Sequence, residues 1–127
     1  MNGHASNGCA VLTIVAKNYL ALAKTLAASL RQFHPEIDFH LLVVDRTGLP
    51  VSEIDPKMIS LIDPLMMMNA AQYNRMAAEY EITEFSTALK PFALRHLITQ
   101  GYGKAIYFDP DILIMRPIDE ILNALDG

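Results

Sequence analysis

The feature that most constrains this fold is a pair of short, almost uninterrupted apolar runs in the first third of the chain. Residues Cys9–Ala16 read CAVLTIVA, and residues Phe39–Val44 read FHLLVV. Such runs, rich in β-branched residues, are typical of strands buried on both faces of a parallel sheet. Between them, apolar residues recur at helical spacing from Tyr19 onward, and His34-Pro35 ends the pattern. The order strand, helix, strand predicts an α/β fold.

The rest of the chain continues this alternation. Strand-like patterns occur in Met58–Met68, where Asp63-Pro64 should break a short strand from a turn or half-helix, in Lys104–Phe108 and in Ile112–Met115. Helical patterns occur in 69–80, in a clearer segment from Thr83 to just before Gly101, and from Pro117 to Leu125. The sequence therefore predicts a parallel sheet with helices on its faces.

Composition is that of one compact domain. The 127 residues, 52% of them hydrophobic, are enough for one domain with a real core and too few for two. Residues 1–8 are small and polar and are expected to be a flexible lead, so the domain proper spans residues 9–127. The formal net charge is -4, and no basic run occurs. Because nucleic-acid binders carry basic patches, we expect no nucleic-acid partner.

Nothing in the sequence predicts export or a membrane span. The apolar run at Cys9 has no Lys or Arg before it and no small-residue cleavage pattern after it, unlike a signal peptide. Charges such as Lys17, Lys24 and Arg31 interrupt every candidate for the roughly 20 apolar residues of a membrane helix. The single cysteine excludes an intramolecular disulfide and fits a reducing compartment. We therefore expect a cytoplasmic protein without a transmembrane segment.

The tripeptide Asp109-Pro110-Asp111 is the most chemically specific feature. In extended backbone, side chains two positions apart lie on the same side, so the two carboxylates are predicted to share one volume. Pro110 lacks an N–H for the sheet and favours extended geometry at Asp109, so the strand should end here and expose the pair. Ligands bind at this carboxyl edge in open α/β sheets. A hard divalent cation, Mg²⁺ or Mn²⁺, would relieve the repulsion and leave coordination positions for diphosphate oxygens.

The same tripeptide has a simpler interpretation. Asp-Pro-Asp is also an ordinary turn sequence in which both acids are solvated. The flanks 105–108 and 112–114 are apolar, which is unusual for a merely solvated turn and favours the metal-site hypothesis. In that hypothesis the cation neutralises the charge that grows on a nucleoside diphosphate leaving group. This is the chemistry of glycosyl transfer rather than of glycoside hydrolysis.

Two stretches of the chain resemble a known enzyme family. They are 13–45, which reads TIVAKNYLALAKTLAASLRQFHPEIDFHLLVVD, and 84–122, which reads EFSTALKPFALRHLITQGYGKAIYFDPDILIMRPIDEIL. Their Asn-Tyr-Leu after the first strand, Ala-Leu-Lys-Pro-Phe helix and Tyr-Phe-Asp-Pro-Asp strand end are similar to those of bacterial glycosyltransferases of the GT-A fold, close to family 8. The resemblance implies a Rossmann-like, mostly parallel sheet with flanking helices. It also implies hexosyl transfer from a nucleotide sugar, expected to be a UDP-sugar, to a saccharide, lipid or protein acceptor.

The resemblance further implies a nucleotide-binding set at matching positions. These positions are Thr13, Val15, Asn18, Tyr19, Asp45, Lys90 and Asp109. In such enzymes the end of the first strand contacts the base, an acid closing the second strand meets the uracil or ribose, and a basic residue before the D-x-D reaches the nucleotide. The implied metal ligands are Asp109 and Asp111, with Asp111 as the principal ligand and Asp109 bridging ribose and ion.

Each of these residues also has a purely structural interpretation. Thr13 and Val15 fit plain strand core, with ligand contacts made largely through backbone atoms. Asn18 fits an N-cap of the following helix. Asp45 and Lys90 fit a solvated loop acid and a solvated helix lysine. The histidines lack ligand-like spacing and are expected to be surface residues or to have partners within the fold; they are His4, His34, His40 and His96.

The chain is also shorter than the resemblance implies for a complete domain, which would run to roughly twice this length. It ends soon after the D-x-D, so the acceptor-binding half and the downstream histidine that completes the metal site have no counterpart in it. We therefore expect weak nucleotide binding and poor or absent sugar transfer. The sheet edge and apolar surface meant for the other half should be exposed or covered by another copy, which predicts a homo-oligomer.

Two other functions fit parts of the pattern. A haloacid-dehalogenase-like phosphotransferase also has a hydrophobic strand that ends in Asp-x-Asp, and Asp109 would then attack phosphate while Asp111 acts as acid or base. Against it, the motif lies late in the chain, and Leu113 stands where that motif usually has a hydroxyl residue. The other alternative is a catalytically inactive nucleotide-binding or assembly module with the same fold.

Overall fold

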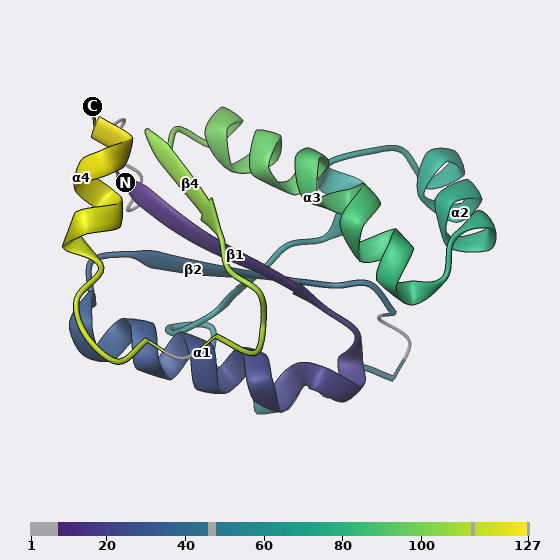
Figure 1. Ribbon diagram of the computed structural model, residues 1–127. Coiled ribbons are helices and arrows are strands. Elements are labelled where there is room, and N and C mark those ends of the chain that lie inside the picture. Colours follow the sequence, from purple (N-terminus) through teal and green to yellow (C-terminus); the bar gives the residue numbers. More distant parts are fainter. Residues whose placement is uncertain (1–7, 46–47, 113, 127) are drawn as a thin grey trace.

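Four parallel strands form one sheet in the order β3-β2-β1-β4, with helices on both faces (Figure 1). The structure, a computed structural model, describes residues 8–45, 48–112 and 114–126, so residues 1–7 of the expected flexible lead lie outside the described residues. The strands are β1 (Cys9–Val15), β2 (Asp38–Val43), β3 (Ser60–Leu61) and β4 (Lys104–Tyr107). The helices are α1 (Leu20–Phe33), α2 (Ala70–Glu79), α3 (Ile82–Thr99) and α4 (Asp119–Asp126). The predicted Rossmann-like α/β class is confirmed.

Strand β1 lies inside the sheet and sets its register. It pairs with β2 from Ala10 opposite Asp38 to Val15 opposite Val43, and with β4 from Cys9 opposite Lys104 onward. Both faces of β1 are covered by side chains, which explains why its sequence shows no polar and apolar alternation. Among the described residues, no helix is both long and apolar enough to cross a membrane.

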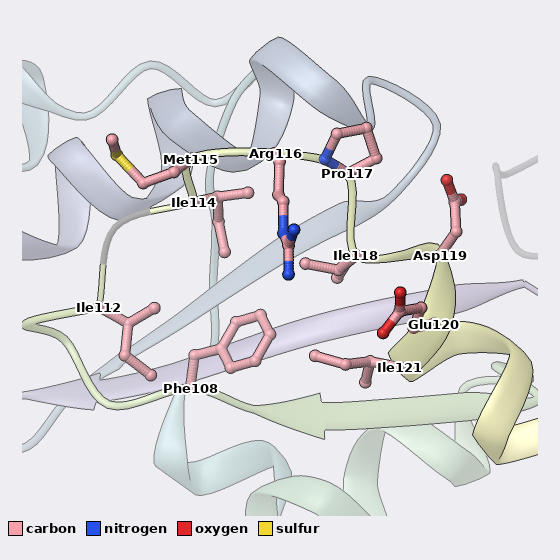
Figure 2. Close-up of a pocket in the computed structure, with 10 residues that line it drawn as sticks. All are labelled: Phe108, Ile112, Ile114, Met115, Arg116, Pro117, Ile118, Asp119, Glu120 and Ile121. Atoms are coloured by element: carbon pink, nitrogen blue, oxygen red, sulfur yellow. The ribbon is translucent and has the colours of Figure 1, made fainter.

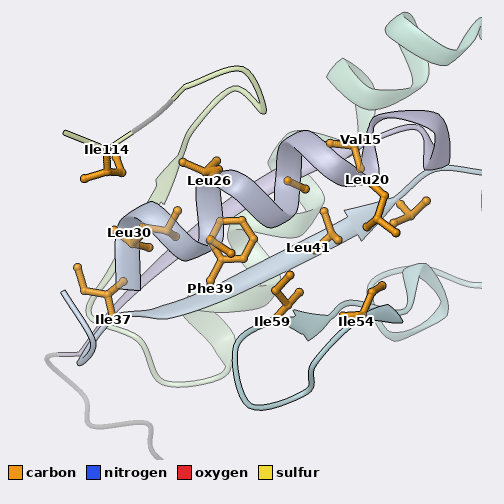
Figure 3. Packing of buried hydrophobic residues seen from close by; sticks show 14 residues of the cluster. Val15, Leu20, Leu26, Leu30, Ile37, Phe39, Leu41, Ile54, Ile59 and Ile114 are labelled. Carbon is orange, nitrogen blue, oxygen red and sulfur yellow. The ribbon is translucent and has the colours of Figure 1, made fainter. Parts of the chain in front are cut away.

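The sheet separates two hydrophobic cores. On one face Val11 and Val15 of β1 meet the buried residues of α1, with Leu26 and Leu30 fully covered (Figure 3). On the other face, residues of β1 and β2 pack against Leu89 and other buried residues of α3. Burying side chains of this size stabilises the fold by about 1.5–3 kcal/mol each. The alternation of the strand side chains thus fixes α1 and α3 on opposite sides.

Helix α1 begins at Leu20, and the prediction that Asn18 caps it is wrong. Lys17–Tyr19 form a 3₁₀ turn, and Tyr19 occupies the N-cap position of α1. No side chain forms a capping hydrogen bond there. Instead, Asp45 accepts a hydrogen bond from the Lys17 amide at 2.6 Å through its Oδ1 atom. A carboxylate that follows β2 therefore holds the chain as it leaves β1.

The strand predicted at Ile112–Met115 does not form. Ile112, Ile114 and Met115 lie outside any strand, and Leu113 lies outside the described residues. The Ile114 amide donates instead to the hydroxyl of Ser29 on α1 at 3.0 Å, and its side chain is buried in the core on that face. A long-range anchor on α1 therefore replaces strand pairing.

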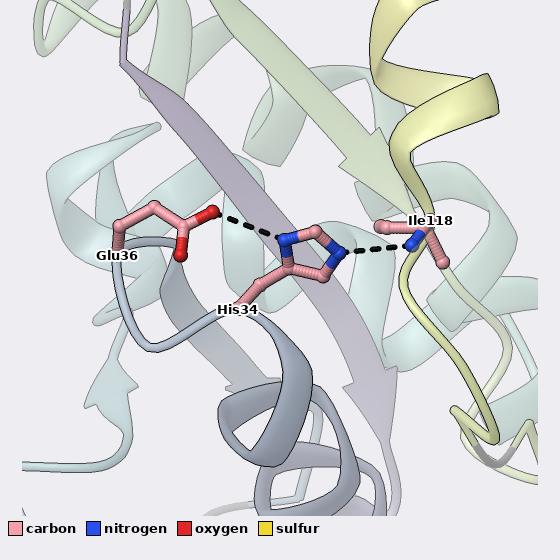
Figure 4. Close-up of polar contacts among 3 residues, drawn as sticks. All are labelled: His34, Glu36 and Ile118. Atoms are coloured by element: carbon pink, nitrogen blue, oxygen red, sulfur yellow. Dashed lines mark hydrogen bonds and ion pairs between the residues drawn. The ribbon is translucent and has the colours of Figure 1, made fainter.

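A second anchor on the same helix end follows at Ile118 (Figure 4). The Ile118 amide donates to Nε2 of the buried His34 at 2.8 Å. The ring proton therefore lies on Nδ1, which donates to the carboxylate of Glu36 at 3.0 Å. Helix α4 then begins at Asp119, two residues after the predicted Pro117.

Buried polar groups also connect the amino ends of the strands. Tyr102, just before β4, donates its hydroxyl proton to Asp38 at 2.5 Å. Nε2 of His40 lies 3.0 Å from the same hydroxyl oxygen and is the donor, because the tyrosine proton is already used. His34 and His40 thus have partners within the fold, as the sequence predicted; His4 lies outside the described residues.

Candidate functional site

The Asp109-Pro110-Asp111 segment forms a turn at the carboxyl end of β4. The Ile112 amide donates to the Asp109 carbonyl at 3.1 Å, so the four residues close a β-turn with Pro110 at its second position. The predicted extended backbone is therefore wrong. The prediction that this segment ends the strand and exposes the acids is confirmed, because both Asp109 and Asp111 are exposed.

Both carboxylates nevertheless act on one neighbour, the hydroxyl of Tyr107. The pKa of Tyr107 is raised, mainly by burial and then by the negative charge of Asp109, with a further contribution from Asp111. Hydrogen bonds involving Ile14 and Thr13 act in the opposite direction. Burial and the two acids therefore all favour the neutral form of the Tyr107 phenol.

A pocket of about 270 Å³ opens beside this turn. Its walls come from the end of β1 and the following 3₁₀ turn, the first half of α3, and the end of β4 with the turn. Four residues of the predicted nucleotide set line it; they are Val15, Tyr19, Lys90 and Asp109. The structure thus brings together one cation, one exposed aromatic ring and one carboxylate from segments far apart in the sequence.

Lys90 contributes the positive charge of the pocket. Its Nζ lies 4.1 Å from the centre of the Tyr107 ring, a cation–π contact that fixes the ammonium group against the pocket wall. No carboxylate in the described ranges forms an ion pair with Lys90. The ammonium charge is therefore positioned but not neutralised, as an anion-binding group needs to be.

The predicted site did not include a row of polar residues on α3. Thr83, Ser86 and Thr87 line the pocket together with Lys90. The spacing of three, one and three residues places all four on one face of a helix, so this stripe was readable from the sequence. Ser86 and Thr87 donate their hydroxyl protons to carbonyls one turn earlier, at 2.9 Å and 3.1 Å. Their oxygens therefore remain available as acceptors.

Two other predicted residues serve the framework of the site, and a third, Asn18, lies outside it. Thr13 is fully buried, and its hydroxyl donates to the Phe108 carbonyl at 2.8 Å, so it holds the backbone just before the turn. Asp45 holds the Lys17 amide, as described above. Asn18 is exposed and does not line the pocket. Thr13 and Asp45 are thus placed to support the site from behind.

The two exposed acids carry carboxylate oxygens, the ligands that hard divalent cations prefer. Among the described residues, no group of three or more His, Cys, Asp or Glu side chains could hold a metal ion. Asp109 lines the pocket and Asp111 does not, so the pocket lining contains one of the two expected metal ligands. Mg²⁺ is commonly bound through one or two carboxylates plus substrate phosphates.

The fold and pocket define the class of this protein as an α/β protein with a parallel sheet and a pocket at the carboxyl ends of its strands. No family matches the sequence, and no curated protein or solved structure matches the chain. Function is therefore inferred from the geometry of the pocket.

Proposed function

We propose that this chain binds a nucleoside diphosphate sugar together with Mg²⁺ or Mn²⁺, as the donor-binding part of a glycosyltransferase. The supporting observation is the pocket in which Tyr19, Lys90 and Asp109 converge at the carboxyl ends of β1 and β4. Open α/β sheets bind ligands at this edge. The single cysteine fits a reducing compartment, and we place the activity in the cytoplasm, with a saccharide, lipid or protein as acceptor.

Each part of the donor has side chains of matching chemistry at the site. The ring of Tyr19 is 53% exposed, which leaves a face on which a base can stack. The acceptor oxygens of Ser86 and Thr87 suit the N–H and O–H donors of a base and ribose. Diphosphate oxygens would lie between the Lys90 ammonium and a cation held by Asp109 and Asp111. When bound, the cation would neutralise the leaving diphosphate as a Lewis acid.

The direct test is calorimetric titration of the chain with uridine and guanosine diphosphates, with and without Mn²⁺. We expect binding that requires Mn²⁺ and that weakens at least about tenfold in Asp111→Asn, equivalent to about 1.4 kcal/mol. Lys90→Met should weaken binding in the presence of metal, because it removes the charge and keeps much of the apolar stem. A preference for uridine over guanosine diphosphate would support a UDP-sugar donor.

The matched control is Glu79→Gln, which removes one negative charge from an exposed position at the end of α2. It should leave the affinity unchanged. Binding that is equally tight in the presence of a chelator, or in Asp111→Asn, would sink the proposed metal-dependent donor site.

The same protein distinguishes the rival functions. An aspartyl-phosphate analogue that forms at Asp109 with beryllium fluoride would support a phosphotransferase. Uridine diphosphate binding without hydrolysis or transfer of a UDP-sugar, in the longest natural form of the protein, would support a noncatalytic binding module. Transfer of the sugar in that form, lost in Asp111→Asn, would support the glycosyltransferase.

A further inference from the structure

A second polar cavity lies beside the last turns of α3, away from the donor pocket. It has a volume of about 290 Å³ and is bounded by α3, by the first turn of α2 and by the 3₁₀ turn Pro64–Met66. Its lining includes Met66, Gln72, Phe92, Arg95 and His96, and we call it the Arg95 cavity. The donor pocket uses the first half of α3, and the two cavities share no lining residue.

The polar side chains of the Arg95 cavity favour an anion. Arg95 carries a permanent positive charge, and no carboxylate in the described ranges forms an ion pair with it. Gln72 and His96 add side-chain N–H donors, and neither side chain has a hydrogen-bond partner within the described part of the chain. Burial lowers the pKa of His96, so its ring is uncharged near neutral pH and has one N–H to donate. Thr99 adds no donor, because its hydroxyl already donates to the His96 carbonyl at 2.7 Å.

The larger groove beside α4 differs in its charges (Figure 2). It has a volume of about 610 Å³, and its lining combines Arg116 with two acids, Asp119 and Glu120. Charges of both signs select neither an anion nor a cation there. In the Arg95 cavity, by contrast, Arg95 is the only charged lining residue that the structure describes. The preference for a negative ligand therefore follows from the lining itself.

Apolar side chains complete the Arg95 cavity. Phe92 is half-buried and packs against the core, whereas Met66 is 64% exposed. An aromatic ring beside a flexible methionine suits a flat or short apolar group, because the methionine side chain adapts to the shape that it contacts. The volume lies at the lower end of the range for small-molecule sites, so the occupant is limited to roughly one ring with one charged group.

We infer that the Arg95 cavity is a second ligand site, which binds a small organic anion through its carboxylate or phosphate group. The guanidinium of Arg95 donates two parallel hydrogen bonds to the oxyanion, and Gln72 and His96 donate to its remaining oxygens. The attached ring or short apolar group lies against Phe92 and Met66. The donor pocket contributes no residue to this site, so the two proposals can fail separately.

The test is titration of the isotope-labelled chain with benzoate and with phenyl phosphate, followed by amide chemical shifts in nuclear magnetic resonance spectra. We expect saturable shifts at Gln72, Arg95 and His96. Benzyl alcohol has the ring without the charge and should bind at least about tenfold more weakly. Inorganic phosphate has the charge without the ring and should bind more weakly than phenyl phosphate. The tighter of the two organic anions identifies the group that the site prefers.

Substitutions locate the site. Arg95 is exposed, so Arg95→Met should not disturb the fold, and it should weaken the binding of either anion at least about tenfold. The matched control is Arg75→Met, which removes the same charge from an exposed position on α2 outside the cavity and should leave the affinity unchanged. Lys90→Met, in the donor pocket, should leave the shifts at Arg95 and His96 unaffected.

Three results would overturn the inference. The first is the absence of saturable shifts at Arg95 and His96 with either anion up to about 10 mM. The second is equal affinity for benzyl alcohol and benzoate, which would mean that the charge is not recognised. The third is unchanged affinity in Arg95→Met.

Discussion

The two ends of the sheet use ionisable side chains in opposite ways. At the amino ends of the strands, His34, His40 and Tyr102 are buried, and each is bonded to another group of the protein. At the carboxyl ends, Asp109 and Asp111 are exposed. The three side chains at the amino ends are thus used by the fold, whereas Asp109 and Asp111 at the carboxyl ends remain exposed to a ligand.

The topology explains this difference. In a parallel sheet, the segments that leave the carboxyl ends form loops over that edge, and those loops carry the 3₁₀ turn with Tyr19 and the turn with Asp109. At the amino ends, the end of α1 and the chain that enters α4 meet, and their backbone amides need acceptors. His34 provides one for Ile118. Substitutions at the two ends should therefore have separable effects on stability and binding.

Removal of the Tyr102 hydroxyl should have the largest effect on stability. In Tyr102→Phe, Asp38 and His40 lose a shared partner in a buried setting, and we expect the free energy of unfolding to fall by about 1–3 kcal/mol. Urea denaturation followed by circular dichroism measures this loss. Tyr80→Phe is the matched control, because Tyr80 is 41% exposed, and it should change stability by less than about 0.5 kcal/mol. Equal losses in the two variants would contradict the role of the buried network.

Loss of the His34 ring should have a smaller and more local effect. His34→Ala leaves the Ile118 amide without its acceptor, and we expect a loss of about 1–2 kcal/mol. Amide hydrogen exchange should accelerate at Ile118 and along α4 more than in β1. His96→Ala, at a half-buried position on α3, serves as the control and should leave exchange in α4 unchanged. Uniform acceleration over the whole chain would indicate general destabilisation instead.

The contribution of Glu36 to the pH dependence of stability should be smaller than either of these losses. Burial alone would raise the pKa of Glu36, but a hydrogen bond from its own backbone amide and the contact with His34 outweigh it and lower the pKa below 4.5. A lowered carboxyl pKa stabilises the fold above the unfolded value, and this contribution disappears as the pH falls through the folded value. Glu36→Gln should therefore flatten the decline in stability as the pH falls below the ordinary glutamate pKa. Because the side chain is 66% exposed, the effect is small, and identical pH profiles would contradict it.

The sequence alone predicted those elements whose local pattern matches their environment in the folded chain. The runs at Cys9 and Phe39 predicted β1 and β2, because continuous burial on both faces leaves a pattern in consecutive residues. The cap at Asn18 and the strand at Ile112 failed, because the deciding contacts come from Asp45 and Ser29, which are distant in the sequence. No local pattern contains that information.

The candidate site was likewise predictable where local patterns suffice, and not where distant contacts decide. Tyr19, Lys90 and Asp109 were predicted through resemblance, and the fold brings them to one pocket. The stripe of Thr83, Ser86 and Thr87 was visible in the helical spacing, but its direction depends on Phe85 and Leu89, which bury the opposite side of α3. The β-turn at Pro110 was one of the two interpretations that the tripeptide allowed. Only the packing of the whole chain decides between them.

The smallest expected effect on stability gives the sharpest form of the comparison. Asp109→Asn and Asp111→Asn change exposed side chains, so each should alter the free energy of unfolding by no more than about 0.5 kcal/mol. The same substitutions should weaken metal-dependent nucleotide binding, whereas Tyr102→Phe should reduce stability and leave the affinity of the folded protein unchanged. Denaturation and calorimetry on the same preparations measure both quantities. If Asp109→Asn lowered stability as much as Tyr102→Phe does, the turn would belong to the framework, and its acids could not be regarded as reserved for a ligand.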